Sequence, residues 1–330
     1  MASEESSGRR PEPRQRAVAL WKPLTELSLT AFGVSVLSFL MIRLIPGDAV
    51  AIMLGANASV TPARIAALRH RLGLDRPLVA QYVHWLWRAL HGDLGTSIWT
   101  GRPVLAEIAA RAGVTAELTL LGLVVAIALA LPAGCAMAAL RGSAADTALR
   151  LVSIAGITVP SFWLGTMLLY GAAALAPGIP LIGWVPFSRD PLANLSHLAL
   201  PVISIALPVV ASLARIVRAA LLEALGQDYI RTARAKGLPE WRVLARHALR
   251  NALVPFVTNA GIMAGYLFGG SVVIEQVFAL PGLGRLMVGA IAERNYPLVQ
   301  AAILLATLVF VIVNALVDLL AAAIDPRLRA

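Results

Sequence analysis

Long uncharged apolar runs alternate with shorter charged segments along most of this chain. A helix that crosses a membrane needs about 20 mostly apolar residues. Six runs free of Asp, Glu, Lys and Arg approach or exceed that length, at 27–42, 118–140, 151–188, 191–214, 251–274 and 295–317. This pattern predicts an all-α integral membrane protein with six transmembrane helices, at 24–45, 114–140, 150–176, 194–214, 251–274 and 297–320.

The segments outside these runs complete the predicted organisation. Residues 1–23 combine Arg, Ser, Glu and Pro without an apolar core, which predicts a disordered tail rather than a signal peptide. A second short tail covers 323–330. Residues 46–112 are long enough to form a small helical subdomain on one membrane face, and 113–322 form the main transmembrane domain.

Two helices are predicted within the subdomain. The first begins with Thr61 as N-cap and stops at Gly73. The second runs from about Pro77 to His91 and carries an apolar stripe at helical spacing. The two helices are expected to pack on the membrane surface rather than to form an independent domain.

The positive charges indicate which side of the membrane each end occupies. Seventeen Arg and Lys residues lie in segments on the same side as the N-terminus, against three in the short segments of the other side, Arg189, Arg285 and Arg294. Positive residues concentrate on the cytoplasmic side of membrane proteins. Both termini are therefore predicted to be cytoplasmic, with the subdomain outside.

Composition supports the membrane class. The chain is 58% hydrophobic and 14% charged, with a mean hydropathy of +0.77, which is too apolar for an ordinary soluble domain. The formal charge of +10 is clustered in connecting segments, so it reflects topology and not nucleic-acid binding. The single cysteine, Cys135, cannot form a disulfide within the chain.

No motif for catalysis, nucleotide binding or metal binding is found. The stretch "PGLGRLMVG" fails the GxGxxG pattern at Met287, and GxxxxGK[ST], HExxH and GxSxG are absent. We therefore expect no catalytic residue, no cofactor and no metal on this chain. His70, His84 and His91 are interpreted as polar surface residues, since a metal site would need further ligands.

Ionisable residues are missing from the centres of the predicted spans. Those nearest to the spans lie at predicted ends, where long side chains reach the interface: Glu26, Arg43, Glu117, His197, Glu275 and Asp318. A proton-coupled secondary carrier needs an ionisable or ion-binding group near the bilayer midplane. That class of transporter is therefore the disfavoured alternative.

Small residues form a line in the fifth predicted span. Gly261, Gly265 and Gly269 recur every four residues and place a smooth groove on one helix face. Such a groove either packs closely against another helix or lines a transport pathway, and the sequence leaves both interpretations open.

A basic segment precedes that span. In "RTARAKGLPEWRVLARHALRNALVP" (231–255), Gly237 is predicted to end one short helix and Pro239 to begin the next. The second helix has an apolar face centred on Trp241 and a basic stripe of Arg242, Arg246 and Arg250. Such an elbow either lies on anionic headgroups or docks a cytoplasmic partner, and periodicity alone does not separate the two.

The flanking stretches carry a resemblance to a known family. They are "RLIPGDA" (43–49), "LRHRLGLDRPLVAQYVHWL" with "HGDLGTSIWTGRPV" (68–104), "DYIRTARAKGLPEWRVLARHALRNALVP" (228–255), "EQVFALPGLGRLMVGAI" with "RNYPLVQAAILL" (275–305), and "DPRLR" (325–329). Together they resemble bacterial ABC-importer permeases, specifically the B-type inner-membrane subunit of the dipeptide, oligopeptide and nickel group.

The resemblance implies a function and a set of partners. Such a permease forms half of the translocation pathway for di- or oligopeptides, or alternatively for nickel, glutathione or another small solute. Its implied partners are a second homologous permease, two cytoplasmic ATPase subunits that bind ATP and Mg, a periplasmic or lipid-anchored substrate-binding protein, and the lipids of the bacterial inner membrane.

The resemblance also places a coupling helix in the loop 215–250. In the family's EAA motif, Gly237 is the motif glycine and Ala233 the second alanine, while Arg231 and Thr232 replace the Glu and the first Ala. Small residues would allow close approach of the ATPase, and basic side chains would bind its acidic groove. The implied coupling residues are Asp228, Tyr229, Arg231, Thr232, Ala233, Arg234, Lys236, Gly237, Leu238 and Trp241.

Overall fold

The computed structural model describes residue 25, residues 28–41, residue 70, residues 75–175, residue 178 and residues 181–324. The tail predicted at 1–23, residues 325–330 of the tail predicted at 323–330, and all but residue 70 of the helix predicted at 61–73 lie outside these residues. Within them the chain is helical apart from turns and one isolated bridge between Thr96 and Pro103, which confirms the all-α prediction.

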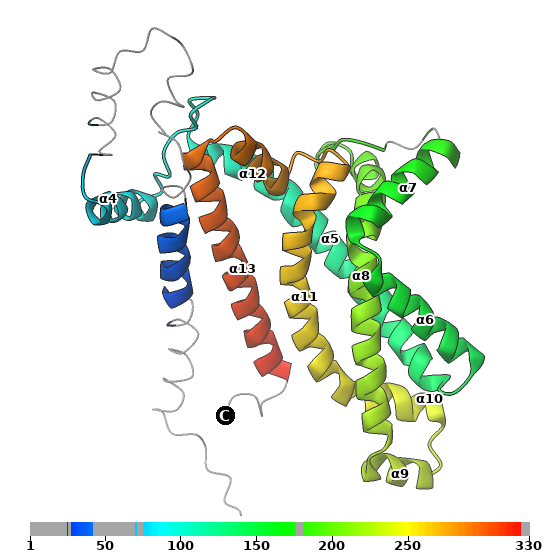
Figure 1. The fold of residues 1–330 in the computed structure, drawn as a ribbon. Coiled ribbons are helices and arrows are strands. Elements are labelled where there is room, and N and C mark those ends of the chain that lie inside the picture. Colours follow the sequence, from blue (N-terminus) through cyan, green and yellow to red (C-terminus); the bar gives the residue numbers. More distant parts are fainter. Residues whose placement is uncertain are drawn as a thin grey trace, which may run out of the picture.

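Among the described residues four helices are long and apolar enough to cross a membrane, or five if one bent helix pair is a single span. They are α5 (Val104–Ala139), α8 (Pro191–Leu225), the continuous helix Glu240–Val277, which contains α11 (Leu249–Val277), and α13 (Tyr296–Ile324). These helices stand side by side in Figure 1. A shorter apolar helix, Ser28–Met41, falls within the first predicted span, so the predicted count of six stays a prediction.

The span predicted at 150–176 is not one continuous helix. The segment instead belongs to two helices, α6 (Ala144–Thr158) and α7 (Ser161–Leu175), whose axes are bent by 101°. Pro160 lies at the break and Val159 before it is extended, because proline lacks an amide hydrogen and disfavours helical geometry in the preceding residue. α6 itself begins at Ser143, whose hydroxyl accepts the Asp146 amide at 3.2 Å.

Two spans extend further than their uncharged runs. α5 begins at Val104 instead of 114, and α8 continues through 215–225 instead of ending at 214. Arginine is a good helix former, so Arg215 and Arg218 end the apolar run without ending the helix. The predicted coupling loop therefore starts with three turns of regular helix.

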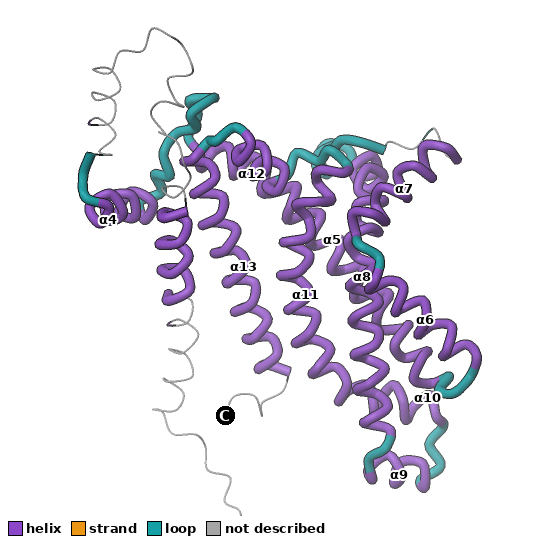
Figure 2. Tube along the Cα trace, viewed as in Figure 1, coloured by secondary structure: helices purple, strands orange, loops and turns teal. Residues whose placement is uncertain are grey.

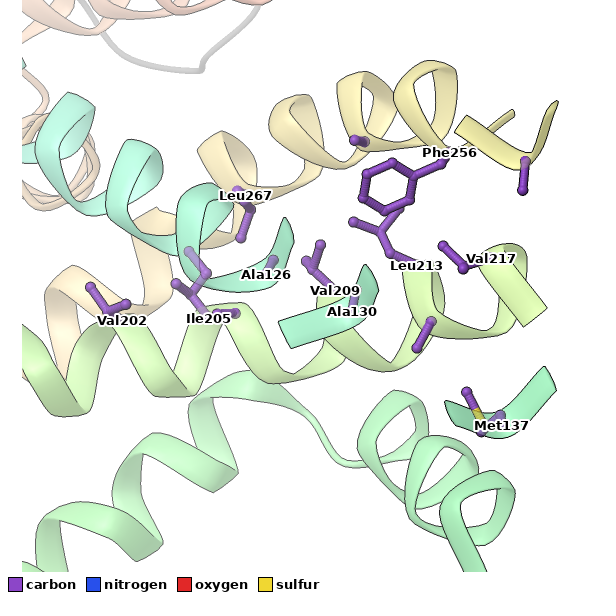
Figure 3. Close-up of a cluster of buried hydrophobic side chains, with 14 of the residues drawn as sticks. Ala126, Ala130, Met137, Val202, Ile205, Val209, Leu213, Val217, Phe256 and Leu267 are labelled. Carbon is purple, nitrogen blue, oxygen red and sulfur yellow. The ribbon is translucent and has the colours of Figure 1, made fainter. Parts of the chain in front are cut away.

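The core lies between α5, α8 and α11 (Figure 3). Gly134 of α5 allows α5 and α8 to approach closely, since a Cβ atom there would lie 2.5 Å from Cβ of Val217 and 2.7 Å from the carbonyl oxygen of Ala214. The other buried residues of this core include Ala126, Ala130 and Met137 from α5, Ile205, Val209 and Leu213 from α8, and Phe256 and Leu267 from α11. Small residues on α5 and larger ones on α8 thus bring these two helices into tight contact.

Short helices cover the two ends of the bundle (Figures 1 and 2). At one end lie α4 (Leu78–Leu90) and α12 (Leu283–Ala292). At the other end lie α9 (Asp228–Ala235) and α10 (Glu240–Arg242), which belong to a segment that we call the elbow, residues 226–242. α4 matches the helix predicted from about Pro77 to His91.

Two aromatic residues of the apolar stripe of α4, Tyr82 and Trp85, pack against the helix Ser28–Met41. The ring of Tyr82 lies 5.3 Å from that of Phe39, and its hydroxyl is 2.7 Å from Oγ of Ser35. Trp85 extends the aromatic contact at 6.0 Å from Phe39. Residues far apart in sequence therefore hold α4 against this apolar helix.

Candidate functional site

The elbow leaves the bundle at the end of α8 and returns to it at the start of α11 (Figure 1). Two side chains of α9 face the bundle, Ile230 with 0% and Ala233 with 5% exposure. The other predicted coupling side chains are exposed or, for Leu238, half-buried: Asp228, Tyr229, Arg231, Thr232, Arg234, Lys236 and Trp241. Two buried apolar side chains thus attach α9 to the bundle, and its polar face points outward.

Gly237 ends α9 in the left-handed conformation, with φ +75°. The Gly237 amide donates to the carbonyl of Arg234 at 2.9 Å and the Leu238 amide to that of Ala233 at 3.4 Å, which is the hydrogen-bond pattern of a Schellman cap. Pro239 then caps α10 at its N-terminus. The prediction that Gly237 ends a short helix is confirmed.

Ion pairs hold most of the elbow's charges. Arg234 donates to both carboxylate oxygens of Glu240 at 2.7 and 3.1 Å, which braces α9 against α10 and raises the pKa of the Arg234 guanidinium. Arg231 lies 3.3 Å from Asp228 one turn earlier. Within the described residues Lys236 has no such partner, so its ammonium group is available to a binding partner.

A polar contact fixes α9 to the next span. The Asn251 amide donates to the Tyr229 hydroxyl at 2.7 Å, which joins α9 to the first turn of α11. On the neighbouring α10, the Arg242 guanidinium lies 5.1 Å from the ring centre of Trp241. The elbow is therefore tied to α11 and is not a loose loop.

The apolar face predicted around Trp241 is only partly buried, because Ala248 and Ala252 of that face are buried while Trp241 at its centre is not. Trp241 is 65% exposed and Ala245 is exposed, whereas Val243, which lies off the predicted face, is fully buried. The cause is a π-helical turn over Val243–Ala248, which holds more residues than an α turn and shifts the helix face. The buried line consists of Val243, Ala248 and Ala252.

Ala233 and Gly237 occupy different environments. Ala233 is buried against its own chain, so its small side chain serves packing inside the protein in this conformation. No atom of the described residues lies within 4 Å of the position of a Cβ atom at Gly237, so the backbone there is open to another molecule. Of the two small residues, only Gly237 lies at the surface.

The three glycines of α11 also differ. Gly261 and Gly265 are buried, whereas Gly269 is exposed. A Cβ atom at Gly265 would overlap the ring of Phe310 in α13, so this glycine allows α11 and α13 to pack closely. At Gly269 no atom from the part of the chain that the structure describes lies within 4 Å of a Cβ position. Packing within the chain thus explains why a glycine is needed at 265. Gly269, in contrast, lies on an exposed face of α11.

Glu275 is a buried polar residue whose role the sequence did not reveal. Its position near a span end suggested that it reaches the interface, but its exposure is 0%. The Thr115 hydroxyl of α5 donates to one carboxylate oxygen at 2.6 Å, and the Arg285 amide donates to the other at 2.9 Å. The backbone of Gly282 approaches the Glu275 carboxylate so closely that a Cβ atom there would overlap it.

Glu275 and Thr115 together cap α12. The Leu283 amide donates to the Thr115 hydroxyl oxygen at 2.8 Å, beside the bond from the Arg285 amide to Glu275. Both amides belong to the first turn of α12, where helices lack internal acceptors. A carboxylate and a hydroxyl from two spans therefore fix the start of α12.

The histidines show no shared site. His70 lies 2.7 Å from Asp75, His91 lies 2.8 Å from the carbonyl oxygen of Trp87, and His84 is exposed. No group of three potential metal ligands occurs within the part of the chain that the structure describes.

Family models match both parts of the chain. Residues 130–330 match the binding-protein-dependent transport system inner membrane component family, and residues 21–119 match the N-terminal membrane component of the same systems. The elbow and the capped α12 both lie within the first match.

Relatives match nearly the whole chain. A putative peptide transport system permease protein of Brucella abortus (strain 2308) is 44% identical over 296 residues, which are 90% of this chain and 94% of the relative. The glutathione transport system permease protein GsiC of Escherichia coli O6:H1 is 40% identical over 93% of this chain and 97% of its own. The dipeptide transport system permease protein DppB of Escherichia coli (strain K12) is 38% identical over 91% and 95%.

The fold is similar to that of a solved transporter. A chain of the MetNI methionine ABC transporter, in an inward-facing conformation, aligns with a TM-score of 0.54 and 19% identity, over 66% of this chain and 96% of its own. The protein thus belongs to the family of inner membrane components of binding-protein-dependent transport systems, as a multi-pass ABC-importer permease of the peptide and nickel group.

Proposed function

We propose that this chain forms half of the translocation pathway of an ATP-driven importer for di- or oligopeptides. The other half is a second homologous permease, and a periplasmic or lipid-anchored binding protein delivers the substrate to the α12 end. In this arrangement both termini and the elbow are cytoplasmic, which agrees with the distribution of positive residues.

The elbow is the proposed contact with the ATPase subunits, and its geometry carries the proposal. α9 projects from the bundle with its polar face exposed, while Ile230 and Ala233 anchor it. The Arg234–Glu240 pair and the bond from Asn251 to Tyr229 connect it to α11. A force on α9 is thus transmitted to a membrane span, which is what coupling requires.

We assign ATP hydrolysis to the partner ATPase subunits. ATP and Mg would bind to the two ATPase subunits, and this chain is proposed to have no catalytic site and no cofactor of its own. Its role is to change conformation when the ATPases close.

The test of coupling uses Gly237 in a reconstituted complex. Val at 237 is strained at φ +75°, whereas Asn tolerates this conformation and serves as the matched control. We expect Gly237→Val to abolish most of the ATPase stimulation by loaded binding protein and Gly237→Asn to retain it. Stimulation that is unchanged in Gly237→Val, with the complex intact, would contradict the assignment.

Cargo is tested separately. Names of relatives favour peptides, including the tripeptide glutathione. We expect labelled dipeptide uptake by proteoliposomes that contain the complete importer to require ATP and to be reduced by competing peptides. Competition by nickel and not by peptides would assign the alternative cargo, and uptake that follows a proton gradient without ATP would support a secondary carrier.

A further inference from the structure

A groove of 740 Å³ lies between α6 and α8, apart from the elbow and the capped α12. Three arginines and three isoleucines line it: Arg150, Ile154, Ile157, Arg215, Ile216 and Arg218. Arginine side chains rarely gather on an apolar span unless an anion or the headgroup layer balances them.

The charge within the groove is only partly neutralised. Arg218 binds the buried Asp146 through two hydrogen bonds of 3.0 and 2.9 Å, and Arg150 lies 3.6 Å from the same carboxylate. Arg215 is exposed and has no ion pair within the described part of the chain. Two of the three guanidinium groups therefore share one carboxylate and the third has none among the described residues, which leaves the groove positive.

The position of the arginines along α8 matches the headgroup layer. Arg215 follows Pro191, the first residue of α8, by 24 residues, which corresponds to about 36 Å of helix. A hydrocarbon core is about 30 Å thick. If α8 enters the membrane at Pro191, Arg215 and Arg218 reach the phosphates of the leaflet at the elbow end.

The groove also has a polarity gradient. Along α6, Arg150 precedes Ile154 and Ile157 at one helix face, and α6 begins at the elbow end. The guanidinium groups thus lie toward the headgroups and the isoleucines toward the membrane centre. An anionic head with an acyl chain fits this order better than a free anion, which has no apolar part.

We propose that this groove binds an anionic phospholipid, with its phosphate on Arg150, Arg215 and Arg218 and an acyl chain along Ile154 and Ile157. The competing occupant is the second permease, whose surface would cover the same face of α6. Neither the elbow assignment nor the cargo enters this inference.

The test measures lipid binding to the full chain by native mass spectrometry in detergent. Short-chain phosphatidylglycerol is titrated against phosphatidylcholine. We expect phosphatidylglycerol to be preferred and Arg215→Gln to weaken its binding about five-fold, which corresponds to about 1 kcal/mol per arginine. The double variant Arg150→Gln/Arg215→Gln is expected to weaken it about 25-fold.

Two control variants separate the effect of the lost charge on lipid binding from an effect on folding. Arg189→Gln removes an exposed arginine outside the groove and is expected to leave the binding unchanged. Arg215→Lys retains the charge and is expected to bind within a few-fold of the natural chain, which shows that a loss in Arg215→Gln does not arise from unfolding. Arg218 is left in place because it also balances Asp146.

Three results would overturn the proposal. They are equal binding of phosphatidylcholine, unchanged phosphatidylglycerol binding by the double variant, and displacement of the lipid by millimolar inorganic phosphate. In the assembled importer, a photo-crosslinker at Ile154 is expected to label phospholipid. A crosslink to the second permease instead would assign the groove to the interface between permeases.

Discussion

The Thr115 hydroxyl lies 2.6 Å from a carboxylate oxygen of Glu275, 160 residues away in sequence, and both side chains are almost completely buried. Thr115→Val leaves a carboxylate oxygen and the Leu283 amide without their partner, which costs about 1–3 kcal/mol. We expect a lower melting temperature for the purified chain. Thr119→Val is the control, because its hydroxyl donates to the backbone carbonyl of Thr115 one turn away in the same helix, and it should melt almost unchanged.

Glu275→Ala should be more damaging than Thr115→Val. It removes the acceptor of the Arg285 amide and of the Thr115 hydroxyl together, so about 3–5 kcal/mol is expected. Hydrogen exchange in α12 should rise in both variants, because α12 loses its cap. Unchanged exchange in Glu275→Ala would refute the capping role.

The contact between α5 and α8 predicts opposite effects of the same substitution at two glycines of α5. Gly134→Ala forces a methyl group against Val217 and Ala214 and should destabilise the chain by about 1–3 kcal/mol. Gly113→Ala enters open space in the same helix and should be neutral or stabilising by up to about 1 kcal/mol. Thermal unfolding in detergent distinguishes the two.

The π-helical turn predicts different tolerance at two alanines. Ala248 is fully buried, so Ala248→Leu should overpack the core and cost about 1–3 kcal/mol. Ala245 is exposed, so Ala245→Leu should change the melting temperature little. Similar effects at both positions would indicate the regular α-helical register instead.

Acidification should loosen the loop that follows α4. The hydrogen bond from the Gly95 amide and the ion pair with Arg88 lower the pKa of Asp93 below its ordinary value of 3.8. A lowered folded-state pKa contributes stability that is fully present above the unfolded-state value and is lost as pH falls through the folded-state value. Hydrogen exchange of residues 92–103 should therefore increase below about pH 4.

Asp93→Asn provides the control for this pH effect. It retains an oxygen acceptor for the Gly95 amide but has no ionisable group, so the dependence on pH should disappear. The change is small because half of the Asp93 side chain is exposed to solvent. An equal pH dependence in the variant would assign the effect to another group.

The spans could be predicted from sequence because hydropathy adds over about 20 residues and tolerates local errors. The bend between α6 and α7 could not be predicted in this way. Pro160 breaks a helix, whereas Pro201 and Pro208 lie inside α8, so the same residue type has opposite outcomes that depend on neighbouring helices.

The candidate site shows the same limit. Gly237 was predictable because positive φ is a local property of one residue. The burial of Glu275 was not, since it depends on Thr115 in another span. Ala233 fits the motif of the family, but only the packing of α9 shows that its side chain faces inward.

The π-helical turn of six residues has a consequence for the evolution of the elbow. The wider π turn holds one residue more than the α turn that it replaces and absorbs that residue locally. Deleting one residue from it would therefore restore α-helical geometry and leave Trp241 and the elbow facing as they do now relative to α11. Deleting a residue from the regular helix that follows would instead rotate the elbow by about 100°, so this turn is the place where the connection can change in length without redirecting the elbow.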